Sequence, residues 1–301
     1  MDKKGLLFAF GAYLTWGLFP IYWKWLQQVG ALELLSHRIL WSFAFLFLAV
    51  LAGKNWRDFR AAIQNRKVIA VYFAAAILIG VNWLTYVWAV NAGFIVETSL
   101  GYFINPLLSV SLGVLFLRER LRPLQWLPVG LAALGVAYLT FAYGRLPWIA
   151  LVLAFSFGIY GLVKKVAPLG SVYGLTLETG ILFLPALLYL GVQEATGKAA
   201  FLRADPITNL LLVGAGVVTT VPLLMFASAA HRIPLTMIGL MQYLAPTLQF
   251  LLGVLVYKEP FNATQAIGFG SVWVALVIFW LESWAAQRAI RPEPIPELGE
   301  G

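Results

Sequence analysis

The 301-residue sequence contains no cysteine and few charged residues, and both shortages exclude whole classes of protein. Without cysteine there is no disulfide framework, no thiolate metal site and no thiolate nucleophile. Charged residues make up 11% of the chain, whereas an ordinary soluble domain carries about 25%. Because 61% of the residues are apolar, a soluble protein of this size could not bury its apolar surface. The composition therefore excludes a soluble enzyme, a disordered chain and a collagen-like fibre.

Motifs for catalysis and for cofactor binding are also missing. The sequence has only two histidines, and it shows no zinc-ligand spacing, no phosphate-binding loop and no nucleophile elbow. We therefore expect no enzymatic activity, no metal, no cofactor and no ATP-driven step. The net charge of +8 does not predict a nucleic-acid partner, because the basic residues lie between apolar runs, where membrane topology places them.

Long apolar runs are what the sequence does contain, and a bilayer core needs about 20 apolar residues per helix. We count ten such runs: Gly5–Trp25, Leu32–Leu51, Val68–Val90, Phe94–Leu117, Leu124–Tyr143, Trp148–Val163, Val172–Val192, Ile207–Ala229, Pro234–Tyr257 and Thr264–Trp284. They predict an all-α integral membrane protein with ten transmembrane helices. The connections are short, so the bilayer is the main partner of the chain, and the tail 288–301 is expected to be disordered.

The distribution of lysine and arginine predicts the orientation. With ten spans, both termini lie on the same side, and 15 of the 21 basic residues fall on that side. The positive-inside rule then places both termini in the cytoplasm. The run after the basic residues at the N-terminus is longer than a typical signal core and has no small-residue cleavage site after it, so we interpret it as the first span.

The two halves of the sequence, 1–143 and 144–287, resemble each other at an offset of about 140 residues. Pro106, Gly113 and Arg118-Glu119 recur as Pro246, Gly253 and Lys258-Glu259. Each half contains five spans, and an odd number makes the second half enter the membrane from the opposite side. We therefore predict a 5+5 inverted-topology repeat, which is a common basis for alternating access.

Two stretches carry a resemblance to a known family, and they run from Asn82 to Asn91 and from Glu97 to Leu107. Together with Ser36-His37-Arg38 and the stretch Gln242–Thr247, they resemble the RarD branch of the EamA family, in the drug/metabolite transporter superfamily. The resemblance implies ten helices, a location in the inner membrane, and secondary transport that is usually export. It also implies a central cavity among helices 1–4 and 6–9, and the members of this branch are described as chloramphenicol-sensitivity permeases.

Charged side chains inside lipid cost several kcal/mol, so each one needs a reason. Arg38 lies about six residues into the second span; it either faces the cavity and binds an anionic or dipolar substrate, or extends to the headgroups. The neighbouring His37 is a structural hydrogen-bonding residue or a proton carrier. Glu178 has no partner nearby in the sequence, so it is protonated, paired with another helix, or used for coupling or gating. Glu97 either caps the fourth span or contributes to an outer gate.

Matched prolines and a set of polar and aromatic residues outline the expected cavity. Pro106 and Pro246 are read as a paired hinge, with tolerated kinks as the alternative. The other candidates for substrate binding are Trp16, Asn82, Trp83, Tyr86, Tyr102, Asn105, Gln242, Tyr243 and Gln249. Aromatic walls with a few amides suit small amphipathic or aromatic solutes. We assign the tryptophans outside this set, such as Trp23 and Trp148, to the membrane interfaces.

These observations predict a secondary-active transporter that exports small organic metabolites or drug-like aromatic compounds by alternating access. An uptake permease for amino acids or related metabolites is the alternative, since the sequence does not give the direction. A channel would need a continuous polar stripe along several helices, and the polar residues here are few and clustered. A coupling proton is one candidate driving ion, and the sequence fits a monomer and a homodimer equally well.

Overall fold

The computed structural model describes residues 2–53, 56–92, 94–144, 146–258 and 263–289, and all secondary structure in this part of the chain is helical. The chain divides into two compact units. One contains residues 1–119 and 145–260, and the other contains residues 120–144 and 261–301.

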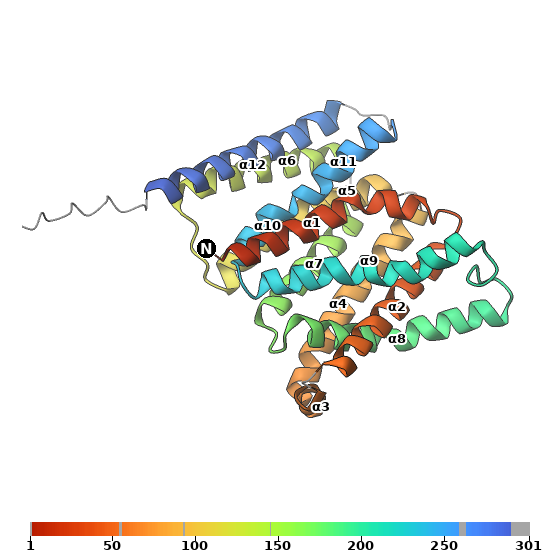
Figure 1. The fold of residues 1–301 in the computed structure, drawn as a ribbon. Coiled ribbons are helices and arrows are strands. Elements are labelled where there is room, and N and C mark those ends of the chain that lie inside the picture. The colour runs from red at the N-terminus through yellow and green to blue at the C-terminus, as the bar shows by residue number, and fades with distance from the viewer. Residues whose placement is uncertain (1, 54–55, 93, 145, 259–262, 290–301) are drawn as a thin grey trace, which may run out of the picture. The chain divides into compact units, whose positions relative to one another are not determined.

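The first unit is a bundle of long helices (Figure 1). Its members are α1 (Lys3–Lys24), α2 (Ala31–Ala52), α3 (Trp56–Gln64), α4 (Arg66–Asn91), α5 (Ile95–Phe116), α7 (Trp148–Val166), α8 (Ser171–Ala195), α9 (Pro206–Ala230), α10 (Leu235–Gln242), α11 (Leu244–Leu251) and the π-helical segment η2 (Leu252–Val256). Within it α2 packs on α8 and α9, α1 packs on α9 and α11, and α5 packs on α7 and α10. The core is formed by buried side chains of α1, α4, α7, α9 and α10.

Each of the ten predicted runs coincides with helical structure in the described residues. Eight helical segments there are long and apolar enough to cross a membrane, and two further apolar segments, Leu100–Phe116 and Ala266–Glu282, are shorter.

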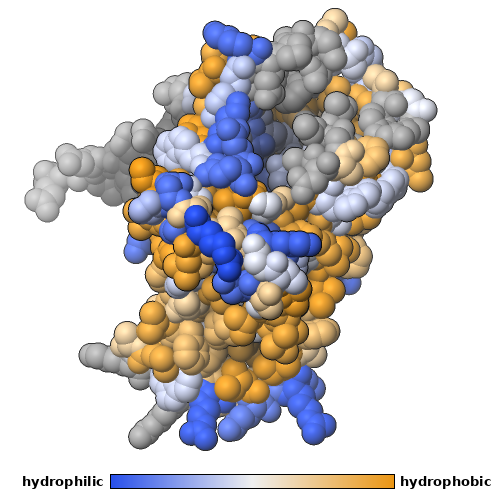
Figure 2. Space-filling model, turned by 90° about the vertical axis from the view of Figure 1, so that its right-hand side faces the viewer, coloured by the Kyte–Doolittle hydropathy of each residue, from blue (hydrophilic) through white to orange (hydrophobic). Residues whose placement is uncertain are grey.

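On the face shown in Figure 2, apolar side chains cover a broad area, and hydrophilic side chains gather beyond its upper and lower edges. Many large apolar side chains are exposed, including Leu7, Leu48 and Phe73. This pattern fits a multi-pass membrane protein, whose outer surface contacts lipid tails.

Side-chain caps define the beginnings of two long helices. The Asp2 carboxylate accepts hydrogen bonds from the amides of Lys4 and Gly5 at the start of α1. The Asp205 carboxylate caps α9 in the same way, and Pro206 follows at the first helical position. Hydrogen bonds from the Thr208 hydroxyl and amide lower the pKa of the Asp205 carboxyl below its usual range.

The two helical runs that contain the matched prolines, Pro106 and Pro246, differ in structure, although the sequence predicts that they match. The helix α5 continues through Pro106 without a break. The ninth run is instead divided into α10, α11 and η2, and α10 ends immediately before Tyr243. Glycine allows the two helices to approach: a Cβ added at Gly239 would lie 2.7 Å from the carbonyl oxygen of Pro106.

The short helix α3 was not expected from the sequence, where this region was treated as a polar connection. Its residues place apolar side chains on one face. Phe59 is buried against the ring of Tyr173 on α8, with centroids 5.6 Å apart, and Trp56 packs on Phe47 at the end of α2. The segment is therefore anchored to the bundle by aromatic contacts.

The second unit contains the short helix η1 (Pro123–Gln125), α6 (Trp126–Tyr143) and α12 (Ala263–Ala289). The helices α6 and α12 pack closely, because Gly268 leaves room for Leu139 and Gly135 leaves room for Ser271. An ion pair between Arg122 and Glu282, with nitrogen and oxygen 2.9 Å apart, joins their ends. The predicted disordered tail 288–301 lies largely outside the described residues, and α12 extends to Ala289.

Candidate substrate cavity

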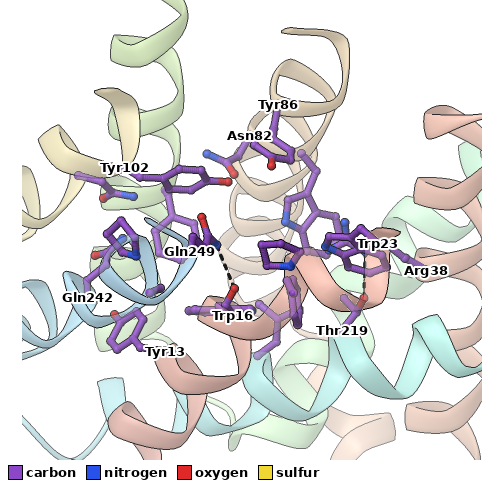
Figure 3. A pocket seen from close by; sticks show the side chains of 18 residues that line it. Tyr13, Trp16, Trp23, Arg38, Asn82, Tyr86, Tyr102, Thr219, Gln242 and Gln249 are labelled. Carbon is purple, nitrogen blue, oxygen red and sulfur yellow. Dashed lines mark hydrogen bonds between the residues drawn. The ribbon is translucent and has the colours of Figure 1, made fainter. Parts of the chain in front are cut away.

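A cavity of about 270 Å³ lies inside the first unit (Figure 3). This is slightly below the range typical of small-molecule pockets. Its wall combines aromatic rings, amides, one cation and a few apolar side chains from α1, α2, α4, α5, α7, α9, α10 and α11. The lining residues are Tyr13, Trp16, Phe19, Pro20, Trp23, Arg38, Asn82, Trp83, Tyr86, Tyr102, Asn105, Phe157, Thr219, Leu223, Gln242, Ala245, Pro246 and Gln249.

Arg38 is the single charged residue in this lining. Its Nε donates a hydrogen bond to the Thr219 hydroxyl, 2.9 Å away on α9. Its guanidinium carbon lies 4.8 Å from the ring centre of Trp23 and 5.0 Å from that of Trp83. Such cation–π contacts hold a guanidinium in place without neutralising it. Among the described residues no carboxylate forms an ion pair with Arg38, so its charge is available to a ligand.

Aromatic side chains form most of the wall and pack against one another. Trp16 contacts Tyr13 and Phe157, with ring centres 5.5 Å and 5.9 Å away. Tyr86 and Tyr102 meet edge to face at 5.8 Å. Rings that are fixed by their neighbours present flat apolar surfaces at little entropic cost, which suits a planar or amphipathic solute.

The amides in the wall fall into two groups. Asn82 donates to the Leu153 carbonyl and the Ser156 hydroxyl on α7, and Gln249 donates to the carbonyl of Trp16, so both amides support the wall. In contrast, Asn105 Oδ1 and Gln242 Oε1 are buried and have no hydrogen-bond partner in the part of the chain that the structure describes. Unsatisfied buried acceptors are uncommon, so each one needs an explanation.

Nine of the ten residues predicted to bind substrate line this cavity, and Pro246 does too. Tyr243 does not line it, so the expectation that it faces the shared space is wrong. Its side chain is buried against α5, and its hydroxyl donates to the Phe103 carbonyl at 3.3 Å. Pro106 is not part of the lining either, although its neighbour Asn105 is.

The sequence interpretation missed several lining residues, notably Tyr13, Trp23 and Thr219. Trp23 was assigned to the membrane interface, but it stacks on Arg38. Its position near the end of the first span made it indistinguishable from an interface residue. The lining residues of the first span recur at Tyr13, Trp16, Pro20 and Trp23, and this spacing of three and four residues could have identified the lining face of α1.

Glu178 lies outside the cavity lining, in a separate buried cluster. Its carboxylate accepts hydrogen bonds from Lys164 Nζ at 2.7 Å and from the Tyr160 hydroxyl at 2.9 Å. The side chains of Glu178 and Lys164 are each 1% exposed. Of the alternatives for Glu178, the structure shows pairing with a neighbouring helix, because both partners lie on α7. The sequence interpretation missed Lys164, which was counted as a loop residue.

Of the two remaining coupling candidates, His37 lies apart from the cavity lining. His37 is buried beside the ring of Phe201, with Nε2 4.0 Å from the Glu33 carboxylate. Glu33 in turn accepts hydrogen bonds from the amides of Ala200 and Phe201. Glu97 belongs to α5, but its side chain is outside the described part of the chain.

A carboxylate at the end of α5 caps the beginning of α10. Glu119 accepts hydrogen bonds from the amides of Leu235 and Thr236, at 2.7 Å and 2.9 Å. Lys165 donates to the nearby carbonyl of Ile233 at 2.7 Å. Since α10 has no side-chain cap within its own segment, Glu119 provides one from the other half of the sequence.

A bundle of helices long and apolar enough to cross a membrane, with an aromatic cavity that contains an arginine, fits a membrane transporter. Comparison with known proteins gives the family: the sequence profile of the EamA-like transporter family matches residues 3–141 and again residues 146–281. The chain therefore belongs to the EamA-like transporter family, which confirms the predicted resemblance.

Two curated relatives show how much of the chain this similarity covers. Protein RarD of Streptomyces exfoliatus is 47% identical over 96% of this chain and 91% of its own length. The uncharacterized transporter YojE of Bacillus subtilis is 46% identical over 95% of this chain and 97% of its own. A chain of known crystal structure, 18% identical, superposes with a TM-score of 0.68 over 94% of this chain and 99% of that chain, and this match shows the fold alone.

Proposed function

We propose that this transporter is a secondary-active exporter of small organic molecules that carry a carboxylate and an aromatic or otherwise apolar body. The observation that carries the proposal is Arg38: a guanidinium inside an aromatic cavity, oriented by Thr219 and without a carboxylate partner among the described residues. A cation at membrane depth costs several kcal/mol, which a ligand carboxylate would offset when it binds.

The aromatic wall supports the second part of this substrate class. Indole and phenol rings surround Arg38, and the cavity offers far more apolar than charged surface. A small inorganic anion would leave these rings in contact with water, whereas an aromatic or amphipathic acid would cover them. An organic cation would be repelled by Arg38, because the lining residues that the structure describes include no acidic side chain to offset this charge.

For the transport mechanism, we propose alternating access between two inverted five-helix repeats, 1–143 and 144–287. The helix contacts support this proposal. The proposed repeat matches α1 with α7, α2 with α8, α4 with α9, α5 with α10/α11 and α6 with α12. If each helix is replaced by its counterpart, the contact α1–α9 becomes α7–α4, α1–α11 becomes α7–α5, and α2–α9 becomes α8–α4. All of these helix pairs are in contact. The pairs α2–α8, α5–α10 and α6–α12 map onto themselves. Arg118 and Lys258, at matched positions, share an uncommon positive φ of 54° and 57°.

Pro106 and Pro246 are our proposed hinge. Each proline removes one backbone hydrogen bond from its helix, and α5 and α10 cross closely at Gly239. The break between α10 and α11 lies next to the cavity residues Gln242 and Pro246. A change in helix direction at this break would therefore reshape the cavity directly.

We propose that the protein lies in the inner membrane with both termini in the cytoplasm, where the excess of basic residues places them. For the coupling ion we propose a proton. The described residues of the cavity lining include no acidic residue, so the groups to test for proton binding are Glu178 and His37, which lie outside that lining, and Glu97.

Transport by purified protein in liposomes tests the proposal. Vesicles loaded with radiolabelled phenylpropionate should release it faster than empty liposomes, and Arg38→Gln should remove most of this difference. The matched control is Arg203→Gln, because Arg203 is an exposed residue paired with Glu194 outside the helices of the cavity. Equal transport by Arg38→Gln and wild type would contradict the proposal.

Efflux from intact cells, compared with uptake into them, distinguishes an exporter from an uptake permease.

A further inference from the structure

The cavity has a second polar end, formed by three buried side-chain atoms without hydrogen-bond partners in the described chain. They are the hydroxyl of Tyr13 on α1, Oδ1 of Asn105 on α5 and Oε1 of Gln242 on α10. The three side chains are 0%, 2% and 6% exposed. Leaving such groups unsatisfied costs free energy in each case, and here three of them line one cavity.

Chain geometry adds acceptors at the same end. Proline has no amide hydrogen, so Pro106 cannot donate to the carbonyl of Tyr102, and Pro246 cannot donate to the carbonyl of Gln242. Both carbonyls belong to residues that line the cavity. The two prolines therefore leave the carbonyls of the lining residues Tyr102 and Gln242 without the amide donor that a non-proline residue would supply.

The two polar ends are distinct. Figure 3 shows Gln242 and Tyr13 on one side of the cavity and Arg38 with Trp23 and Thr219 on the other, with Trp16 between them. The end at Arg38 offers donors with a positive charge and therefore suits a carboxylate. The opposite end offers neutral carbonyl acceptors and one hydroxyl, which suit a group that carries N–H donors.

We infer that the substrate has two polar ends: a carboxylate that binds Arg38 and, at the far end of an aromatic body, a neutral amine or amide whose N–H groups bind Asn105 and Gln242. This inference rests on the proposed function and specifies the substrate further. A charged ammonium fits this end less well, because none of the described lining residues offers a carboxylate that would replace its water.

Three probes of closely related structure test the inference. Phenylpropionate has the carboxylate and the ring, and para-aminophenylpropionate adds an amine at the far end of the ring. Phenylalanine is an isomer of the latter, with its amine beside the carboxylate. Binding to the purified full-length protein is measured by isothermal titration calorimetry at one pH and salt concentration.

Wild-type protein should bind para-aminophenylpropionate about tenfold more tightly than phenylpropionate, as expected for two added neutral hydrogen bonds in a buried site. Asn105→Leu and Gln242→Leu should each reduce this preference to threefold or less. Gln193→Leu is the matched control, since Gln193 bonds to Tyr189 on α8 outside the lining. If a leucine variant does not fold, Tyr13→Phe removes only a hydroxyl and should still reduce the preference.

The outcomes separate this inference from the proposed function. If phenylpropionate binds and Arg38→Gln abolishes the binding, but the far amine adds no affinity, then the second polar end is refuted and the carboxylate site stands. Phenylalanine binding as tightly as para-aminophenylpropionate would also refute it. If none of the three probes binds, both proposals fail.

Discussion

Lys164 and Arg38 both carry a positive charge inside the helix bundle, and their surroundings are opposite. Lys164 is 1% exposed and touches the Glu178 carboxylate at 2.7 Å, and Glu178 receives a further hydrogen bond from Tyr160. Arg38 lies at a cavity wall, is oriented by a neutral hydroxyl and two indole rings, and has no carboxylate partner in the described residues.

The difference indicates how each charge is used. A buried ion pair that is fully hydrogen-bonded is a closed structural unit, and losing either partner leaves an uncompensated charge. A cation held by aromatic rings is fixed in position but not neutralised, so its remaining interaction energy is available to a ligand. We therefore expect substitutions at the pair to change stability and substitutions at Arg38 to change transport.

The largest effect is expected for Lys164→Met. Removing the lysine leaves the Glu178 carboxylate buried without its cation, which should cost about 3–5 kcal/mol and lower the yield of folded protein. Fluorescence-monitored thermal unfolding of the detergent-purified protein measures this change.

A double variant sharpens this prediction. Replacing both residues, as Lys164→Met with Glu178→Leu, removes the uncompensated charge and should restore most of the lost stability. If the double variant is stable but no longer responds to a pH gradient, Glu178 is the coupling group. Transport with an unchanged response to the gradient would leave the pair with a structural role only.

The next effect is expected for Arg38→Gln, and it should appear in transport rather than in folding. Losing a charged hydrogen bond to the substrate carboxylate costs about 2 kcal/mol, or about thirtyfold in transport at low substrate concentration. The thermal midpoint should change little, because no partner is left with an unpaired charge. Arg38→Lys should restore only part of the transport, because lysine lacks the planar fork of arginine. A large loss of stability in Arg38→Gln would remove the contrast with Lys164.

The sequence predicts the helices better than their interruptions. Each apolar run coincides with helical structure, because a span of about 20 apolar residues is dictated by the bilayer. The difference between the fourth and ninth runs was not predicted: matched interruptions were expected, but α5 continues through Pro106, while Pro246 lies just after a break. The difference arises from packing against neighbouring helices, which local sequence does not record.

In the candidate site, too, the sequence predicts which residues belong together within a helix but not how neighbouring helices contact one another. Sequence-based reasoning assigned Tyr102, Asn105 and Gln242 to the expected cavity, and all three line it. It could not find the partner of Glu178, because Lys164 lies on another helix and its contact depends on how α7 and α8 cross. It also misplaced Tyr243, which follows Gln242 in the sequence but points to α5.

A smaller effect is expected for Tyr160→Phe, which removes one of the two hydrogen bonds to Glu178 and keeps the ion pair. The expected loss is about 1.5 kcal/mol of stability, and transport should remain near wild type, because Tyr160 does not line the cavity. Thermal unfolding and phenylpropionate transport are measured on the same preparation. A selective loss of transport at unchanged stability would show that the cluster takes part in the transport cycle.

The smallest effect is expected for Glu119→Gln, which tests a third way of satisfying a charge: backbone amides alone. The two carboxylate oxygens of Glu119 accept one hydrogen bond each, from the amides of Leu235 and Thr236 at the start of α10, and glutamine keeps one of these acceptors while it loses the negative charge. The lost charge and the lost hydrogen bond together should cost about 1 kcal/mol, so the thermal midpoint should fall slightly. Glu119→Leu, the matched control, also removes the acceptor and should fall further, because two amides lose their partner. If instead Glu119→Gln alters transport more than stability, the contact between α5 and α10 opens and closes during the cycle, and this cap belongs with Arg38 rather than with the Lys164–Glu178 pair.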